Sequence, residues 1–306
     1  MNAGTVTRTE RVGFVGLGAM GVGMAKNVLA AGYPLSVLGH SRREPVERLV
    51  GLGATEVSSA RELAEASDIV VLCVTTSEVV ESLITGPDGL LSGERGASAG
   101  PLLVIDCGTS NPVSTQAMGE ALAAAGASLM DVPLGRSAQA AEEGTLNMMA
   151  GGRDEDFARA KPVLDSMSEN LFHLGPLGTG HTIKLLNNAY SMSVAVLCAQ
   201  IVATARAGGV DVSQLVDVMA AGPNRSGFFD WMMVAATEGD TTKLDFALKH
   251  GLKDVGYFNA LADTLDVPVS LPQAAAGALQ AVVDAGRGDE SVPSLMLEPG
   301  RSPDRA

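Results

Sequence analysis

Cationic residues are scarce in this sequence of 306 residues, which has 21 lysines and arginines against 35 aspartates and glutamates. The formal net charge is −14 at pH 7. A surface with this excess of negative charge repels phosphate backbones and anionic lipid headgroups. The composition therefore argues against sequence-independent binding to nucleic acid or to a membrane surface.

Cysteine is also rare, and the three cysteines, Cys73, Cys107 and Cys198, stand far apart in apolar runs. An odd number at wide spacing predicts reduced core residues of a cytoplasmic protein, not a disulfide framework. The first eleven residues lack the apolar segment of a signal peptide, and a glutamine interrupts the longest apolar stretch, around Ser193 to Ala205. We therefore expect neither secretion nor a membrane span.

Strand-like and helix-like segments alternate in the first half of the chain. We expect strands at 11–15, 35–38, 69–74, 102–106 and 128–131, with helices at 22–31, 45–52 and 114–125. This alternation predicts an α/β domain with a doubly wound parallel sheet.

The pattern changes near residue 175. A chain of 306 residues is long enough for about two domains of roughly 150 residues each. A helix about 40 Å long is expected from Thr179 to Ala207, and the chain reads as helix down to Ala285. We assign 1–174 to a Rossmann-type domain and 175–306 to an all-helical domain, joined by the long interdomain helix.

A glycine-rich turn, Gly16-Leu17-Gly18-Ala19-Met20-Gly21, lies directly between the first expected strand and helix. In a dinucleotide-binding turn the first glycine permits the tight turn, the second admits the pyrophosphate and the third allows close helix packing. The spacing and the position between strand and helix predict a dinucleotide cofactor held at the helix N-terminus.

The end of the second strand lacks the acidic residue that binds the ribose hydroxyls of NAD in this type of domain. The residues there are His40, Ser41, Arg42 and Arg43, and the first carboxylate is Glu44. Two arginines and a hydroxyl favour the 2′-phosphate of NADP, with NAD remaining an alternative. The other interpretation is a solvated basic start to the next helix.

Lys184 and Asn188 are four residues apart, on one face of the long helix. A lysine flanked by Ile183, Leu185 and Leu186 would be partly desolvated, which lowers its pKa and suits it to proton transfer near neutral pH. The alternative is a solvated helix lysine. No Tyr-x-x-x-Lys pair and no zinc-ligand cluster are found in the sequence, so a metal-free lysine mechanism remains.

Four motifs in order resemble the β-hydroxyacid dehydrogenase family, which includes 3-hydroxyisobutyrate dehydrogenases. They are the run from Gly13 to Gly21 with Ala25 and Asn27, the run from Asp131 to Ser137 continuing to Leu146, the spacing Gly178-x-Gly180-x-x-x-Lys184-x-x-x-Asn188, and Lys253-Asp254. The resemblance makes Lys184 the catalytic acid/base. It assigns substrate binding to Gly135, Arg136, Ser137 and Asn188, and cofactor contacts to Val74, Thr75, Thr109 and Lys253.

Arg136 departs from the family pattern, because most members carry Ser-Gly-Gly where this chain has Gly135-Arg136-Ser137. This version resembles a subgroup that acts on 3-sulfolactaldehyde and on short aldehydes such as succinic semialdehyde. An arginine fork matches a carboxylate or a sulfonate. The alternative is an arginine that faces solvent or pairs with Glu142 or Glu143.

We therefore expect an NAD(P)-dependent oxidoreductase that acts on a small anionic 3-hydroxyacid or its aldehyde. The apolar helices of the second domain predict a homodimer or homotetramer. Two other functions stay open: an imine reductase, against which Lys184 argues, and a dinucleotide-binding scaffold without turnover.

Overall fold

The chain divides into two compact units in the computed structural model, which describes residues 9–94 and 100–297. The units are Met1–Lys184 and Leu185–Ala306. The division falls inside helix α8 (Thr179–Ala207), beyond the expected domain boundary at 174. That boundary remains a prediction, and it lies next to Gly175, where the last strand ends.

The first unit contains one sheet, to which nine strands of the described residues belong. Its order is β3-β2-β1-β4-β5-β6-β8-β7, with β9 paired to β8. The strands from β1 to β6 are parallel, in the order typical of a dinucleotide-binding domain. The strands are β1 (Val12–Val15), β2 (Leu35–Leu38), β3 (Thr55–Val57), β4 (Ile69–Leu72), β5 (Leu103–Asp106), β6 (Ser128–Asp131), β7 (Leu134–Gly135), β8 (Leu146–Gly151) and β9 (Ser168–Gly175).

The predicted doubly wound parallel sheet is confirmed from β1 to β6, and the far end of the sheet is mixed. Strand β8 is antiparallel to β6 and β7, and only β9 returns to the parallel direction, on β8. A parallel neighbour needs a crossover to the opposite edge of the sheet. Between β6 and β8 the chain forms β7 and the short helix α6 (Ala138–Glu143), without a crossover, so β8 runs in the opposite direction.

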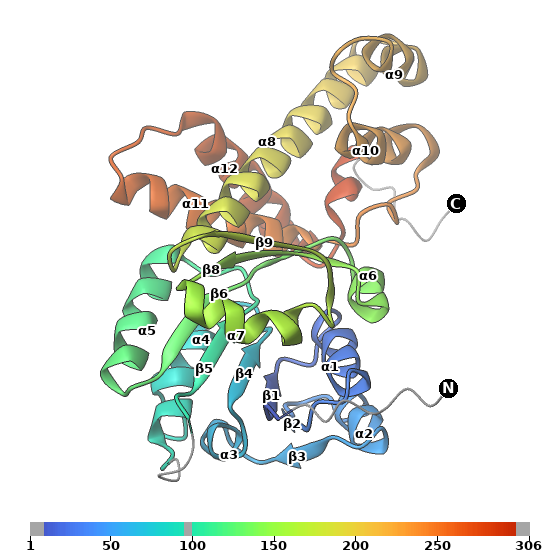
Figure 1. Ribbon diagram of the computed structural model, residues 1–306. Helices are drawn as coiled ribbons and strands as arrows, with labels where there is room; N and C mark the ends of the chain where they lie inside the picture. The colour runs from blue at the N-terminus through green and yellow to red at the C-terminus, as the bar shows by residue number, and fades with distance from the viewer. Residues whose placement is uncertain (1–8, 95–99, 298–306) are drawn as a thin grey trace. The chain divides into compact units, whose positions relative to one another are not determined.

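Apolar side chains cover both faces of the sheet. In β4, Ile69 and Val71 belong to one core layer and Val70 and Leu72 to the other. Helices α1, α2 and α7 contribute to the first layer and α3, α4 and α5 to the second, as the arrangement in Figure 1 shows. Burial on both faces explains why this strand reads as an unbroken apolar run. The helices are α1 (Gly21–Ala30), α2 (Glu44–Gly51), α3 (Ala60–Ala66), α4 (Ser77–Thr85), α5 (Pro112–Ala124), α6 (Ala138–Glu143) and α7 (Asp154–Leu164).

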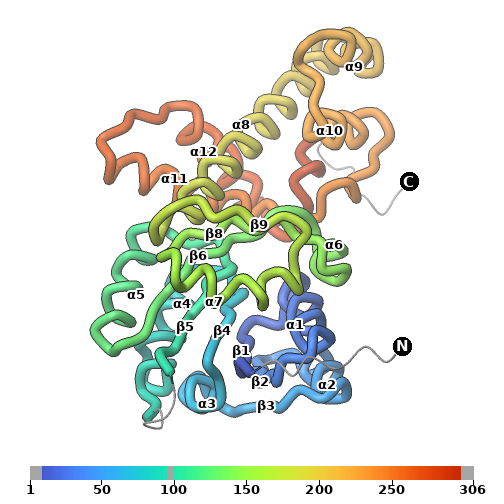
Figure 2. The backbone as a smooth tube through the Cα atoms, in the orientation of Figure 1, coloured from blue at the N-terminus to red at the C-terminus, as the bar shows by residue number. Residues whose placement is uncertain are grey.

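Helices make up the second unit, as expected (Figure 2), and its described residues add one isolated bridge between Ala247 and Ser291. Helix α8 has the bounds predicted from the sequence. Its core includes Met192 and Val202 of α8 with Phe229, Val255 and Leu279 of later helices. These helices are α9 (Val212–Ala220), α10 (Gly227–Glu238), α11 (Leu248–Thr264) and α12 (Ser270–Val282).

Among the described residues, α8 is also the one helix long and apolar enough to cross a membrane, judged by length and composition alone. Within its most apolar stretch, 44% is buried inside the protein. Core helices of soluble proteins pass the same test, so the expectation of no membrane span remains a prediction.

Candidate active site

The glycine turn between β1 and α1 has the geometry expected for each of its three glycines. Gly16 has φ +92°, and a Cβ there would lie 2.2 Å from the carbonyl oxygen of Cys73. A Cβ on Gly21 would lie 1.9 Å from the carbonyl oxygen of Gly16. A Cβ on Gly18 would meet no heavy atom within 4 Å. Packing therefore requires the first and third glycines, whereas the second leaves the backbone open to a ligand.

The N-terminus of α1 fits a dinucleotide pyrophosphate. Met20 occupies the N-cap position and makes no side-chain cap bond, and the first turn holds no acidic residue. The backbone N–H groups of a first helical turn need acceptors, and phosphate oxygens supply them. Leu17 and Ala19 lie in the same turn, so the whole predicted segment lines this helix end.

The basic residues after β2 have separate partners. Arg43 forms a two-pronged ion pair with Glu56 of β3, at 2.5 and 2.9 Å, and this pairing lowers the pKa of Glu56. Arg42 donates from Nη2 to the carbonyl oxygen of Leu17 at 3.4 Å, so its guanidinium lies beside the glycine turn. His40 Nδ1 lies 3.3 Å from Ser41 Oγ. Arg42 is thus better placed for a cofactor phosphate than Arg43.

Glu56 is a residue that the sequence reasoning missed. It lies next to the end of β2, because β3 pairs with β2 and Val37 is opposite Glu56. The sequence gives little signal for it, because β3 has only three residues and its pairing with β2 cannot be predicted locally.

The ends of β4 and β5 lie beside β1 and its glycine turn. Val74 and Thr75 follow β4, which pairs directly with β1, and Thr109 follows β5, which pairs with β4. A Cβ on Gly108 would lie 2.8 Å from the carbonyl oxygen of Val74, so the two loops pass close together. The three predicted cofactor residues therefore lie at the carboxyl edge of the sheet, where ligands bind in such folds.

The thiols at this edge, Cys73 and Cys107, are held in their protonated form. Burial raises the pKa of Cys73 to about 12 and also raises that of Cys107. Both side chains are therefore protonated near neutral pH and are poor nucleophiles and metal ligands. Within 9–94 and 100–297, no group of three or more histidine, cysteine or acidic residues is placed to hold a metal ion.

Arg136 has a backbone conformation that favours glycine, with φ +77°. This agrees with the resemblance, which predicts glycine at this position. Its Nη1 donates to the carbonyl oxygen of Thr145 at 2.7 Å and pairs with Glu169. The alternative of pairing with Glu142 or Glu143 is wrong, because the nearest acidic partner comes from β9.

The residues on either side of Arg136 are held by secondary structure. Gly135 is the second residue of β7 and pairs with Asn147 of β8. Ser137 is the N-cap of α6, where its Oγ accepts the N–H of Ala140 at 3.3 Å. The loop is therefore fixed between a strand and a helix.

The glycines before Lys184 are required by close packing. Gly178 has φ +89°, and a Cβ on Gly180 would lie 2.1 Å from the carbonyl oxygen of Met149. Asp131 Oδ1 accepts the N–H of Gly178, and its Oδ2 accepts the N–H of His181, both at 2.7 Å. Asp131 begins the second motif, so its carboxylate joins the second motif to the third.

Lys184 is half-buried near the start of α8. Ile183 and Leu186 are 36% and 51% exposed, and only Leu185 is buried. Lys184 is therefore partly buried, as predicted, but its three apolar neighbours in the sequence are not the cause. Consecutive residues of a helix point in different directions, so neighbours in the sequence do not surround a helix side chain.

The predicted residues of the second unit meet at one buried carboxylate. Asn188 Nδ2 donates to Asp254 Oδ2 at 2.6 Å, and Lys253 Nζ lies 2.8 Å from Asp254 Oδ1. The Lys253 ammonium also lies 4.8 Å from the centre of the Tyr257 ring. A carboxylate only accepts hydrogen bonds, so Asp254 fixes the orientation of the Asn188 amide.

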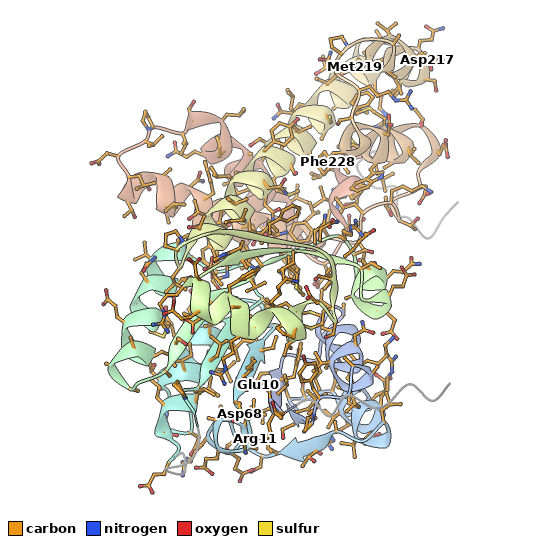
Figure 3. The ribbon with its side chains drawn as sticks, viewed as in Figure 1. Glu10, Arg11, Asp68, Asp217, Met219 and Phe228 are labelled. Carbon is orange, nitrogen blue, oxygen red and sulfur yellow. The ribbon has the colours of Figure 1, made fainter. Side chains whose placement is uncertain are left out.

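A cavity of about 540 Å³ in the first unit contains none of the predicted site residues. It lies where β1 and β4 begin, and Glu10, Asp68, Asp156 and Arg159 contribute to its lining. Glu10 pairs with Arg159, and Asp68 pairs with Arg11. Figure 3 shows Glu10, Arg11 and Asp68 gathered there. The Arg11–Asp68 pair connects the amino ends of β1 and β4, and the Glu10–Arg159 pair connects the start of β1 to α7.

Two family models cover nearly the whole described chain. Residues 11–175 match the NAD binding domain of 6-phosphogluconate dehydrogenase. Residues 178–296 match the NAD-binding domain of NADP-dependent 3-hydroxyisobutyrate dehydrogenase.

Individual relatives agree with these matches. The chain is 38% identical over 208 residues to a 3-hydroxyisobutyrate dehydrogenase of Pseudomonas aeruginosa, covering 68% of each chain. It is 30% identical over 285 residues to a 3-sulfolactaldehyde reductase of Escherichia coli, covering 93% of this chain and 94% of the relative. The crystal structure of a 3-hydroxyisobutyrate dehydrogenase from Salmonella typhimurium superposes with a TM-score of 0.79 at 27% identity, over 94% and 99% of the two chains. The chain therefore belongs to the β-hydroxyacid dehydrogenase family of NAD(P)-dependent oxidoreductases.

Proposed function

We propose that this enzyme transfers a hydride between NADP and a small anionic 3-hydroxyacid, or the corresponding aldehyde, with Lys184 as the acid/base. One observation carries the proposal: the Asp131 carboxylate holds the start of the helix that bears Lys184. Asp131 also ends β6 and leads into the loop of Arg136. Lys184, proposed for proton transfer, and Arg136, proposed for substrate binding, are thereby both anchored at the end of β6.

The residues of this chain have separate roles in the proposed reaction. A bound nicotinamide ring supplies or accepts the hydride. Lys184 gives a proton to the carbonyl oxygen in reduction and takes it from the hydroxyl in oxidation. Asn188, oriented by Asp254, presents its amide oxygen as an acceptor for the substrate hydroxyl.

Arg136 is proposed to hold the anionic end of the substrate. Its present partner, Glu169, is more than half exposed, and exposed ion pairs contribute only about 0–1 kcal/mol. A substrate anion can therefore replace Glu169 at little cost. A sulfonate or a carboxylate fits the planar guanidinium equally well in charge.

A preference for NADP over NAD is proposed from Arg42 and Ser41. The guanidinium of Arg42 lies beside the glycine turn, and the charge of Arg43 is offset by Glu56. A single arginine beside the glycine turn supports a moderate preference, of the order of tenfold.

A homodimer or homotetramer is proposed from the exposed side of α8 in the second unit. Leu186, Tyr190 and Leu197 are 51%, 66% and 48% exposed, and their spacing places them along one stripe of the helix. Sedimentation velocity of the purified protein gives the molar mass that decides this.

A substrate panel with both cofactors tests the proposed function. The panel contains 3-sulfolactaldehyde, succinic semialdehyde, a neutral aldehyde of equal length, and a cyclic imine. We expect turnover of the anionic aldehydes at a higher kcat/KM than the neutral one. Turnover of the imine alone would indicate an imine reductase, and NADP binding without any turnover would indicate a scaffold.

A further inference from the structure

Helix α6 directly follows the proposed substrate loop, residues 135–137, and lies against α1 (Figure 1). Ser137, the last residue of that loop, is the N-cap of α6. Gly144, with φ +72°, ends the helix and is followed by Thr145. The carbonyl oxygen of Thr145 accepts a hydrogen bond from Arg136 Nη1 at 2.7 Å. The position of the Arg136 guanidinium therefore depends on where the two ends of α6 lie.

Two side chains of α1 hold the C-terminal end of α6. Asn27 Nδ2 donates to the carbonyl oxygen of Ala141 at 2.8 Å, and Lys26 Nζ donates to that of Glu142 at 2.7 Å. The last carbonyl groups of a helix lack partners within the helix, and a positive charge is favourable beside them. The Lys26 ammonium also pairs with the Glu142 carboxylate at 2.7 Å. Helix α1 thus supplies the donors that the end of α6 needs.

The close approach of the two helices requires a glycine in α1. A Cβ on Gly23 would lie 2.6 Å from the backbone nitrogen of Glu142, too close for two non-bonded atoms. A Cβ on Gly144 would lie 3.3 Å from Asn27 Nδ2. The Asn27 amide therefore lies beside the residue that ends α6, one residue before the carbonyl group that holds Arg136.

We propose that Asn27 is a positioning residue for Arg136 and that it acts by fixing α6 on α1. This inference rests on the proposed role of Arg136 in substrate binding. Arg136 has φ +77°, a conformation that persists only where the surrounding structure enforces it. The helix proposed to hold the cofactor pyrophosphate thereby also supports the substrate loop. Without the Asn27 amide, we expect the guanidinium to lose its fixed position while the glycine turn is unchanged.

Asn27→Ala removes the amide, and Arg11→Ala is the matched control. Arg11 pairs with Asp68 at the amino end of β1, the strand that leads into the same glycine turn. We expect N27A to raise KM for an anionic aldehyde about fivefold, the effect of one lost hydrogen bond, and to change KM less for a neutral aldehyde of equal length. The Kd for NADP should stay within about twofold, and R11A should leave both KM values within about twofold. Equal KM changes for the two aldehydes in N27A, or no change, overturn the proposal.

A double-mutant cycle shows whether Asn27 acts through Arg136. The guanidinium is already absent from R136G, so adding N27A should change KM for the anionic aldehyde by less than about twofold. If the full effect of N27A persists in R136G, Asn27 acts by another route and the proposal is wrong.

A second variant and a second measurement keep the test independent of how well N27A folds. Gly23→Ala adds a methyl group against α6, although alanine is the better helix former. We expect G23A to show the same split between the two KM values. Hydrogen–deuterium exchange of the α6 amides should be faster in both variants than in the wild type, with exchange in α5 unchanged. Unchanged exchange in α6 of both variants overturns the proposal.

The outcomes separate this inference from the proposed function. If R136G raises KM for the anionic aldehyde and N27A does not, the inference is wrong although the proposed function stands. If R136G leaves that KM unchanged, or the wild type turns over none of the panel, the proposed role of Arg136 is wrong and the inference fails with it.

Discussion

The carboxylate of Asp131 accepts the backbone N–H of His181 at 2.7 Å, across a sequence separation of fifty residues. Its other oxygen accepts the N–H of Gly178. Asp131 thus caps α8 from a different element, where a residue of the helix itself would ordinarily do so. The geometry explains why the motif around Asp131 and the motif around Lys184 occur in one chain. The Asp131 carboxylate fixes the start of the helix that bears Lys184.

Asp131→Asn should therefore destabilise the protein. An amide has one acceptor atom, so one of the two buried N–H groups loses its partner, at a cost of about 1–3 kcal/mol. Urea unfolding followed by circular dichroism measures the change. Asp165→Asn is the control, since Asp165 is half-exposed and pairs with Lys161 on the same helix. Equal effects of both variants would show that the capping role is wrong.

Arg136→Gly should be more stable than Arg136→Ala. Both variants lose the same guanidinium, but only alanine keeps a Cβ at φ +77°. A non-glycine residue in this region costs about 1–2 kcal/mol, part of which is offset by the greater freedom of glycine in the unfolded chain. A difference of roughly 1 kcal/mol in urea unfolding is expected. If Arg136→Ala is as stable as Arg136→Gly, the backbone at residue 136 is not strained.

The same two variants test substrate binding. Each should raise KM strongly for an anionic aldehyde and much less for a neutral aldehyde of equal length, because only the anion loses a charge-assisted partner. Steady-state kinetics on the matched pair of substrates decides this. An equal change for both substrates would mean that Arg136 is structural.

Arg42→Ala should reduce the preference for NADP, measured as the ratio of kcat/KM for NADP and NAD, by about tenfold. Arg43→Ala should change the ratio less, because Glu56 holds that guanidinium. Glu56→Gln should raise the ratio by releasing Arg43. A ratio that Arg42→Ala leaves unchanged would rule out this assignment.

His250 should make the protein less stable in mild acid. Burial, together with the neighbouring Lys249 and Lys253, lowers its pKa below the usual 6.5. The unfolded chain then binds a proton more readily than the folded protein, so stability falls as the pH drops through 6.5 toward the folded-state pKa. Unfolding free energies of wild type and H250Q between pH 8 and pH 5 measure this. The two curves should diverge only below about pH 6.5, and parallel curves would exclude the effect.

Local patterns in the sequence predicted the elements with strong periodicity. The bounds of β2, β6 and α8 agree with the prediction, because each is a clear apolar run or a long helical pattern. Strands β3, β7, β8 and β9 were not predicted, and two of them, β3 and β7, have only three and two residues. The antiparallel return of β8 depends on the path of the chain, which no local pattern reports.

The candidate site was likewise predicted from the sequence only in part. The glycines of both turns were found because a backbone conformation or a close approach demands glycine at a fixed spacing. Glu56 was missed, since its role depends on Arg43, a partner on a different element. The partial burial of Lys184 was predicted for a wrong reason, because neighbours along a helix do not pack around each other.

The most direct test of the account is the kcat of Lys184→Ala, measured with NADPH and the best aldehyde of the panel, alongside the Kd for NADPH. We expect kcat to fall about a hundredfold or more, the usual effect of losing a positioned general acid/base. The Kd for NADPH should remain within twofold, because the glycine turn and Arg42 are untouched. A kcat within a fewfold of the wild type would contradict the assignment of Lys184 and, with it, the proposed mechanism.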